Sequence, residues 1–398
     1  MAPANRSEAN PRVLLLLNNL LQLVTNCAWY IGTPFISLYL VSHGASVGAV
    51  GAVAGLSGIA PLAIALHLGG LVDERGPTLV FVGSVVLFGF GAAMLAAFPG
   101  IVEVTVAYTL LIASNTGLAV ASQAVVAGAS TDATRIRNYG YYAVSYSAGA
   151  VAGPVIGGYL AARFGYAAAF LAMALFMAPS LAVAAVMRVP PAADRRSVAA
   201  RAVHTVIGPI LKEHGVAAVM FVSSIMNCAQ ALQGTFYPLY LSHVGLSPTL
   251  IGVAIAAISV ASMAVRMLLA GAVARLGQKG ALVGAMALSA VAFAVTPIAR
   301  KLVPLLGVSA LMGASLGFTQ PLSMSLLAES VAQPFWGAAF GIRQSVQRVA
   351  SIVSPLIFGV ASTARGVEFA FYLGALVLAG AAGITAKVTD GFGRRPEE

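Results

Sequence analysis

Twelve long apolar stretches constrain the fold of this 398-residue chain more than any other feature. A helix needs about 20 apolar residues to cross a bilayer, and each stretch is close to that length or longer. They lie at roughly 13–41, 48–72, 78–98, 102–129, 136–162, 167–187, 215–242, 249–274, 280–298, 302–329, 336–362 and 368–387. Only 9% of the residues are charged, against about 25% in soluble domains. We therefore expect an all-α membrane protein with twelve transmembrane helices.

The polar segments between the stretches predict the orientation of the chain. With the N-terminus inside, the cytoplasmic segments carry fifteen Lys and Arg residues and the outer loops carry four. The positive-inside rule therefore predicts a multi-pass protein of the bacterial inner membrane with both termini in the cytoplasm. Membrane orientation also explains the net charge of +10 without a nucleic-acid partner. The first stretch exceeds the roughly 7–15 residues of a signal-peptide core, so we expect it to remain as a span.

One polar segment divides the chain into two halves. Residues 188–214 are rich in proline and charge, and they separate six apolar stretches from six. Such a composition is typical of a connecting segment. We expect an N-terminal six-helix bundle over 1–187, a cytoplasmic linker over 188–214 and a C-terminal six-helix bundle over 215–398.

The two halves repeat each other at a constant offset of 201 residues. The triplet Asn-Cys-Ala occurs at 26–28 and again at 227–229, where it holds the two cysteines of the chain. Other pairs at this offset are Gly44 and Gly245, Gly76 and Gly277, Pro154 and Pro355, and Phe170 and Phe371. Parallel repeats of this kind are related by an axis along the membrane normal, and access to the site between them alternates as they rock. We interpret Cys27 and Cys228 as equivalent positions of a duplication, with no disulfide or metal site.

Two glycine motifs stand out in the first half. G-x-L-x-D-x-x-G, between the second and third stretches, is formed by Gly69, Leu71, Asp73 and Gly76. G-x8-G-x3-G-P-x2-G-G, in the fifth stretch, is formed by Gly140, Gly149, Gly153, Pro154, Gly157 and Gly158. With the spans and the repeat, these motifs resemble the major facilitator superfamily (MFS), and the second resembles that of its twelve-span proton-driven efflux antiporters. The resemblance implies two bundles related by a pseudo-twofold axis and proton-coupled export.

The fourth stretch departs from the R-x-x-Q-G pattern of those efflux members. Gly117 matches, but Ala113 stands at the Arg position, which the resemblance implicates in proton coupling. Thr116 stands at the Gln position. The motif of the fifth stretch therefore favours proton coupling, whereas the fourth stretch lacks the Arg that the resemblance associates with it.

The motif residues are predicted to act on conformation. Gly149, Gly153 and Gly157 recur every four residues, so they share a helix face that another helix can approach closely. Pro154 bends the same helix. This face predicts either packing alone or a seal between the halves. Asp73 precedes a tight turn at Gly76 and a helix N-terminus, where an anion is favoured, and we expect it to latch one conformation. The predicted gating residues are Gly69, Asp73, Gly76, Gly140, Gly149, Gly153, Pro154, Gly157, Gly158, Arg266 and Arg343.

Polar side chains inside the apolar stretches predict the cavity, because they are costly in lipid unless they face protein or water. The predicted substrate contacts of this kind are Asn19, Gln22, Asn26, Tyr30, Asn115, Tyr142, Tyr146, Asn227, Gln230, Tyr237 and Gln320. For any one of them, a hydrogen bond between helices of about 0.6–2 kcal/mol is an equal explanation. The set as a whole favours a cavity lining.

Three arginines lie inside apolar stretches. Arg348 lies about 18 Å along the eleventh stretch, at 1.5 Å per residue, with no Asp or Glu at a matching depth. We expect it to face the cavity and to bind an anionic or carboxylate-bearing substrate. Arg266 and Arg343 lie nearer the cytoplasmic side, and we assign them a structural or gating role.

These patterns together predict a secondary transporter that moves a small organic solute by alternating access. We expect it to be a monomer in the lipid bilayer, to use protons, and to need no cofactor and no metal. The chain has no G-x-x-x-x-G-K-[ST] or H-E-x-x-H motif, so we predict that it is not an enzyme. Proton-coupled efflux is the first hypothesis, and uptake or facilitated diffusion of an organic anion is the alternative.

Overall fold

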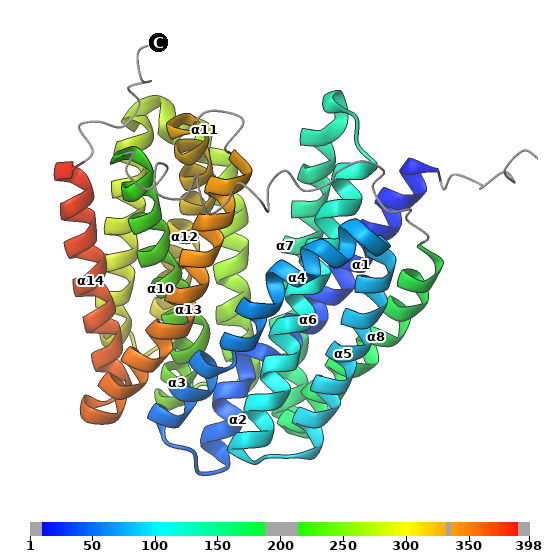
Figure 1. The fold of residues 1–398 in the computed structure, drawn as a ribbon. Coiled ribbons are helices and arrows are strands. Elements are labelled where there is room, and N and C mark those ends of the chain that lie inside the picture. Colours follow the sequence, from blue (N-terminus) through cyan, green and yellow to red (C-terminus); the bar gives the residue numbers. More distant parts are fainter. Residues whose placement is uncertain (1–9, 188–213, 332–335, 389–398) are drawn as a thin grey trace, which may run out of the picture.

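The computed structural model describes residues 10–187, 214–331 and 336–388, and helices form nearly all of this part (Figure 1). The all-α prediction is therefore confirmed for the described residues. The elements are α1 (Pro11–Gly32), η1 (Thr33–Phe35), α2 (Ile36–Ser42), α3 (Val47–Leu56), α4 (Ile59–Arg75), α5 (Pro77–Ala97), α6 (Ile101–Gly128), α7 (Asp132–Phe164), α8 (Tyr166–Val186), α10 (His214–His243), α11 (Pro248–Val295), η2 (Thr296–Ile298), α12 (Leu302–Ser330), α13 (Trp336–Arg365) and α14 (Val367–Val388). The predicted linker lies outside the described residues except for its last residue.

The breaks within the apolar stretches have local causes. Pro34 lies in the first stretch where α1 gives way to the 3-10 turn η1 and then to α2, because proline cannot donate the next helical hydrogen bond. The second stretch divides into α3 and α4 at Ser57 and Gly58. The eighth and ninth stretches are joined as α11, which Gly277 interrupts with a φ of 69°.

Ten helical stretches of the described residues are long and apolar enough to cross a membrane. One of them runs through α11 and η2, although Gly277 separates two predicted spans there. α7 is not among the ten, and its sequence opens with one Asp and two Arg residues and continues with several Tyr and Ser residues. Length and composition thus support a multi-pass membrane protein.

The offset of 201 residues is repeated in the backbone. Six glycines of the described residues have positive φ, and they form the pairs Gly44 and Gly245, Gly76 and Gly277, and Gly165 and Gly366. Positive φ favours glycine because it has no Cβ atom, so the predicted tight turn at Gly76 is confirmed. The core repeats as well. The ring centroids of Tyr39 and Phe170 are 5.0 Å apart, and those of Tyr240 and Phe371 are 5.6 Å apart.

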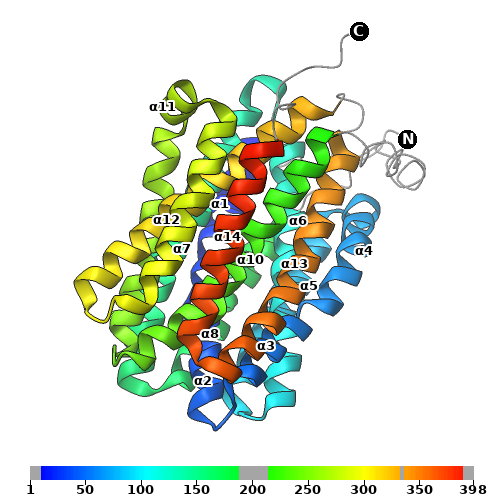
Figure 2. The ribbon, with the colours of Figure 1, turned by 90° about the vertical axis from the view of Figure 1, so that its left-hand side faces the viewer.

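Most helices of the first half (α1–α8) lie on the right in Figure 1 and those of the second half (α10–α14) lie on the left, whereas α3 reaches across to the second half. α1 begins and α14 ends at the same end of the molecule, which we call the terminal end (Figures 1 and 2). The turn between α2 and α3 lies at the opposite end, which we call the distal end. Contacts between the halves are made mainly by α3 with α13 and by α7 with α11.

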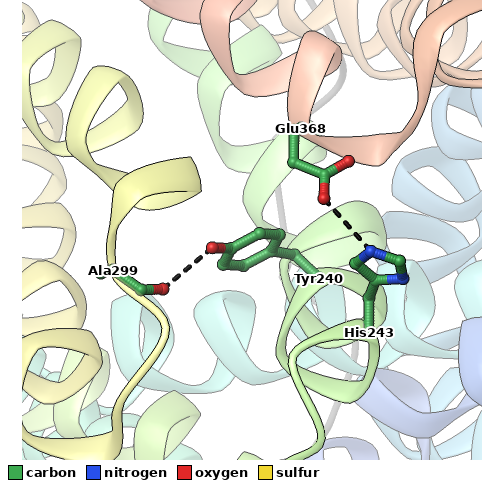
Figure 3. A network of polar contacts seen from close by, with 4 residues as sticks. All are labelled: Tyr240, His243, Ala299 and Glu368. Atoms are coloured by element: carbon green, nitrogen blue, oxygen red, sulfur yellow. Dashed lines mark hydrogen bonds and ion pairs between the residues drawn. The ribbon is translucent and has the colours of Figure 1, made fainter.

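A small polar network joins three elements at the distal end of the second half (Figure 3). The hydroxyl of Tyr240 on α10 donates to the carbonyl oxygen of Ala299, which follows η2, at 2.9 Å. Nε2 of His243, at the end of α10, lies 3.2 Å from Oε1 of Glu368 on α14. All of these partners belong to the second half, so the network holds that half together and does not bridge to the first.

Candidate functional site

The two halves meet backbone to backbone where α3 crosses α13. A Cβ atom built on Gly51 would lie 2.8 Å from the Cα atom of Gly359 and would overlap the carbonyl oxygen of Pro355. Real Cβ atoms essentially never come that close to other heavy atoms. Only glycine at position 51 allows this approach, so the crossing closes the distal end on one side.

A second crossing, of α7 with α11, closes the other side of the distal end. A Cβ atom on Gly252 would overlap the carbonyl oxygen of Pro154, and one on Gly158 would lie 3.2 Å from the Cα atom of Thr249. Oγ1 of Thr249 donates to the carbonyl oxygen of Gly158 at 3.4 Å. Adding 201 converts Gly51 into Gly252, Pro154 into Pro355 and Gly158 into Gly359. The two crossings are therefore equivalent contacts of a duplicated chain.

The remaining glycines of the α7 motif pack within the first half. A Cβ atom on Gly149 would lie 2.7 Å from the backbone nitrogen of Cys27, and one on Gly153 would lie 2.6 Å from the carbonyl oxygen of the same residue. One on Gly157 would overlap the backbone of α1. Gly140 differs, because an added Cβ atom would meet open space there. All residues of the motif except Gly140 therefore pack closely against α1 or α11.

Two predicted gating residues, Gly69 and Asp73, lie on α4. Their contacts with other residues fall outside the described part of the structure. The proposed role of Asp73 as a latch stays a prediction.

The predicted contacts on α1 lie in a buried polar layer. Gln22 and Asn26 are 5% and 2% exposed, and Nδ2 of Asn26 donates to the carbonyl oxygen of Gln22 at 3.0 Å. The side-chain oxygens of Asn19 and Asn26 are buried, and no described residue hydrogen-bonds to them. Asn18, which the sequence analysis did not select, accepts a hydrogen bond of 2.9 Å from Ser122 of α6. The unsatisfied oxygens of Asn19 and Asn26 need a hydrogen-bond donor from outside the described residues.

The aromatic candidates of the first half lie between α1 and α7. The hydroxyls of Tyr30 and Tyr146 are 3.5 Å apart, and Tyr146 is 38% exposed. Tyr142 and Asn115 are half-buried. Arg266 of α11 is exposed. These side chains are accessible in this conformation, in contrast to the distal crossings.

Arg348 of α13 reaches from the second half to the first. Its Nη2 donates to Oγ1 of Thr116 on α6 at 3.3 Å. It is half-buried, and no carboxylate of the described residues pairs with it. It precedes Ile352 by one turn, and the carbonyl oxygen of Ile352 lies against Gly55 of α3. The guanidinium therefore lies between the halves, at the edge of their contact.

Arg343 lies in a small polar pocket formed by α10, α12 and α13. Its Nε donates to Oγ of Ser223 at 3.1 Å, and its Nη2 donates to Oγ of Ser323 at 2.8 Å. The hydroxyl and amide side chains that line this pocket are Ser223, Asn227, Gln230, Thr319, Gln320, Ser323 and Gln347. We call it the Arg343 pocket. It brings together three predicted substrate contacts, Asn227, Gln230 and Gln320, around an arginine that we expected to be structural or gating.

Tyr237 lies elsewhere, in the core of the second half. It is 0% exposed, and its hydroxyl donates to the carbonyl oxygen of Leu305 at 3.2 Å and lies 2.8 Å from Oγ of Ser309. Its ring packs against Phe371 at 6.3 Å between centroids. In this conformation Tyr237 contacts packing residues and does not line the Arg343 pocket.

The sequence analysis missed several polar partners. Thr116, Ser223 and Ser323 accept hydrogen bonds from arginines, but serine and threonine are common in membrane helices and bond to their own backbone. Nothing in the sequence therefore distinguishes these three residues from other serines and threonines of the apolar stretches. Gln347 was detectable, because it follows Arg343 by four residues and so shares its helix face.

These features define the class of protein. A duplicated helical membrane protein, with halves in contact at one end and polar and cationic side chains in its interior, has the architecture of a secondary transporter. The model of the Major Facilitator Superfamily matches residues 19–299 and again residues 219–396. The chain therefore belongs to this superfamily, and it is a transporter and not an enzyme. No curated relative matches the sequence.

Solved structures agree with this fold. The nucleoside transporter NupG is similar with a TM-score of 0.76 and 15% identity, covering 95% of this chain and 99% of that one. A bacterial homologue of the human lysosomal transporter Spinster, in an inward-facing and occupied conformation, has a TM-score of 0.77 and 11% identity, covering 97% and 98%. The peptide transporter POT has a TM-score of 0.72 and 15% identity, covering 94% of each chain. At these identities the likeness concerns the fold alone.

Proposed function

We propose that this protein is a twelve-span secondary transporter that moves a small organic solute by alternating access. Its two six-helix bundles, over 1–187 and 215–398, rock about a pseudo-twofold axis. Ten apolar helical stretches are found in the described residues, and one of them, through α11 and η2, is divided by Gly277 into two spans. With α7 as a further span, the total is twelve. The observation that carries the proposal is the pair of crossings at the distal end, which are equivalent through the offset of 201 residues.

The conformation corresponds to the state that is closed toward the outside. The positive-inside rule assigns the terminal end to the cytoplasm of a bacterial inner membrane, so the distal end faces outward. The protein works as a monomer, because each chain supplies both bundles. Thiol labelling of single cysteines at the two ends, in intact cells and in inverted vesicles, tests this orientation. Labelling of the terminal end from outside the cell would contradict it.

The interior supports an organic anion as the solute. Arg348 presents a guanidinium between the halves, and arginine binds carboxylates in a planar, two-point geometry. The acidic residues of the described part of the chain all lie within two residues of a helix end: they are Asp73, Glu74, Glu103, Asp132, Glu329 and Glu368. Among the described residues, no carboxylate therefore lies on a helix at the middle of the membrane, where it could neutralise Arg348. This charge balance favours an anion as the solute, which is the hypothesis of uptake or facilitated diffusion of an organic anion.

Proton-coupled export is the second candidate, and the α7 motif carries it. Gly149, Gly153 and Gly157 pack on α1, and Pro154 and Gly158 contact α11. A helix packed this tightly against both halves can transmit their movement and seal the distal end. Ala113, at the position of the family's proton-coupling Arg, counts against this candidate.

Transport by the purified protein in liposomes tests both candidates. A thermal-shift screen against carboxylates, sugars and antibiotics first identifies a ligand, since binding to the native state raises its stability. For an anion, Arg348→Lys should retain part of the transport rate and Arg348→Ala should lose nearly all of it. Arg365→Ala, an exposed arginine at the distal end of the same helix, is the matched control and should transport normally. A fully active Arg348→Ala protein would exclude the role of Arg348.

Proton coupling is measured separately. Inverted vesicles that have been acidified should release protons when an exported solute is added, and an uncoupler should abolish solute accumulation. Flux that continues unchanged with the uncoupler would exclude proton-coupled export and would leave facilitated diffusion of the anion.

A further inference from the structure

The Arg343 pocket holds a buried positive charge with no negative charge to balance it. Arg343 is 3% exposed, and no carboxylate among the described residues forms an ion pair with it. A guanidinium stays protonated in proteins, and a buried ion is strongly unfavourable unless it is paired. An anion from outside the chain would therefore be bound favourably here.

The hydrogen-bonding groups of the pocket have a surplus of donors. A guanidinium has five N–H donors, and Arg343 uses two of them, on Ser223 and Ser323. The other three donors make no hydrogen bond to the described residues. The hydroxyl of Ser323 donates a hydrogen bond to the carbonyl oxygen of Gln320 at 3.0 Å. The hydroxyl of Ser223 accepts from Arg343 and donates to none of the described residues, so its hydrogen is available to a ligand.

The amides of the pocket add further donors. Oδ1 of Asn227 accepts a hydrogen bond from Ser351, so the NH₂ group of Asn227 stays available to a ligand. The side chains of Gln230 and Gln347 also line the pocket, and each carries an NH₂ group. Positive charge combined with hydroxyl and amide donors is the chemistry that coordinates an anion.

The size of the pocket selects the kind of anion. Its free space holds about one water molecule. A halide is a single atom, whereas sulfate and phosphate place four oxygens around a central atom. The space therefore favours a halide over these larger oxyanions.

The first half has no equivalent of this pocket. At the positions that lie 201 residues earlier, Tyr142 replaces Arg343 and Gln22 replaces Ser223, although Ser122 matches Ser323. Tyr142 is neutral at physiological pH. The position equivalent to Arg343 thus carries no charge, and the duplication gives one candidate site of this kind in each chain.

We propose that the Arg343 pocket, between α10, α12 and α13, binds one halide ion per chain, held by the guanidinium of Arg343 and the hydroxyl of Ser223. This ion is distinct from the transported solute, which we assign to Arg348 between the halves. The halide balances the charge of Arg343 and fixes the packing of these three helices.

Thermal unfolding of the full chain in detergent tests the proposal, with sodium gluconate exchanged for sodium chloride or bromide at constant ionic strength. Chloride and bromide should each raise Tm by about 2 °C or more in a saturable manner. Sulfate should give no saturable rise, only the gradual stabilisation that an excluded salt produces. Arg343→Gln should abolish the halide dependence. Ser223→Ala should raise the apparent Kd for chloride several-fold, and it provides the test if Arg343→Gln does not fold.

Arg348→Gln is the matched control, because it removes the other interior arginine. It should keep the full chloride response, even if it loses all transport, so the halide site and the proposed function fail independently. A Tm that does not depend on chloride would overturn the proposal, and so would a chloride response that survives in Arg343→Gln and Ser223→Ala. Stabilisation by formate or acetate without any by chloride would also overturn it, because the pocket would then hold a carboxylate.

Discussion

Replacing Gly51 with alanine should open the distal end of the transporter. The added Cβ atom would lie 2.8 Å from the Cα atom of Gly359 and would overlap the carbonyl oxygen of Pro355. Both are backbone atoms, so no side chain can turn away and α3 must move from α13. Overpacking of this kind typically costs about 1–3 kcal/mol. In the proposed alternating-access cycle this contact exists only while the distal end is closed. The whole cost should therefore shift the equilibrium between the two states, by a factor of about 5–150.

The shift can be measured as a distance between the halves at the distal end. Spin labels at His43→Cys and Lys301→Cys, both exposed positions in distal turns of opposite halves, report it by pulsed electron spin resonance. The background protein carries Cys27→Ala and Cys228→Ala, so that only the introduced thiols react. Gly51→Ala should increase the population with the longer label distance, and Gly252→Ala should act in the same direction at the equivalent crossing.

Gly83→Ala is the control for the general effect of alanine. Gly83 lies inside α5, where an added Cβ atom would meet open space, so the label distance should not change. The reasoning is refuted if Gly51→Ala gives the same distance distribution as Gly83→Ala, or if it favours the shorter distance. In either case the close approach of α3 and α13 would not control the closed state.

Three further tests address individual residues. Asp73→Asn should reduce the transport rate while substrate binding stays largely intact, because a latch acts on the conformational step; an equal loss of both would indicate a folding defect. Tyr237→Phe should lower the free energy of unfolding by about 0.5–1.5 kcal/mol, through loss of its hydroxyl hydrogen bonds, with little change in transport; a large loss of solute affinity would instead identify Tyr237 as a substrate contact. Cys27→Ala combined with Cys228→Ala should transport normally whereas Asn26→Ala should not, and the reverse result would reject the assignment of the cavity lining to the asparagines.

The candidate site was only partly predictable from the sequence. Polar and charged side chains in apolar stretches selected Asn227, Gln230, Gln320 and Arg348, because burying such groups in lipid is costly whatever the fold. The same argument could not separate Tyr237, since a buried tyrosine that bonds to a neighbouring helix satisfies it equally well.

The sequence by itself determined the helical membrane architecture and the duplication. Long apolar stretches leave the backbone no alternative to helices in lipid, and positive φ at Gly76 and Gly277 depends on the absence of a Cβ atom, which is a local property. The turns at Gly165 and Gly366 follow the same rule.

Only the tertiary structure decided which helices of the two halves contact each other. That α3 closes on α13 through Gly51, and that Arg343 shares a pocket with Ser223 while Arg348 reaches Thr116, depends on residues more than a hundred positions apart. Periodicity places a side chain on a face of its own helix. It does not say which helix lies opposite that face, because the packing of many helices sets this together.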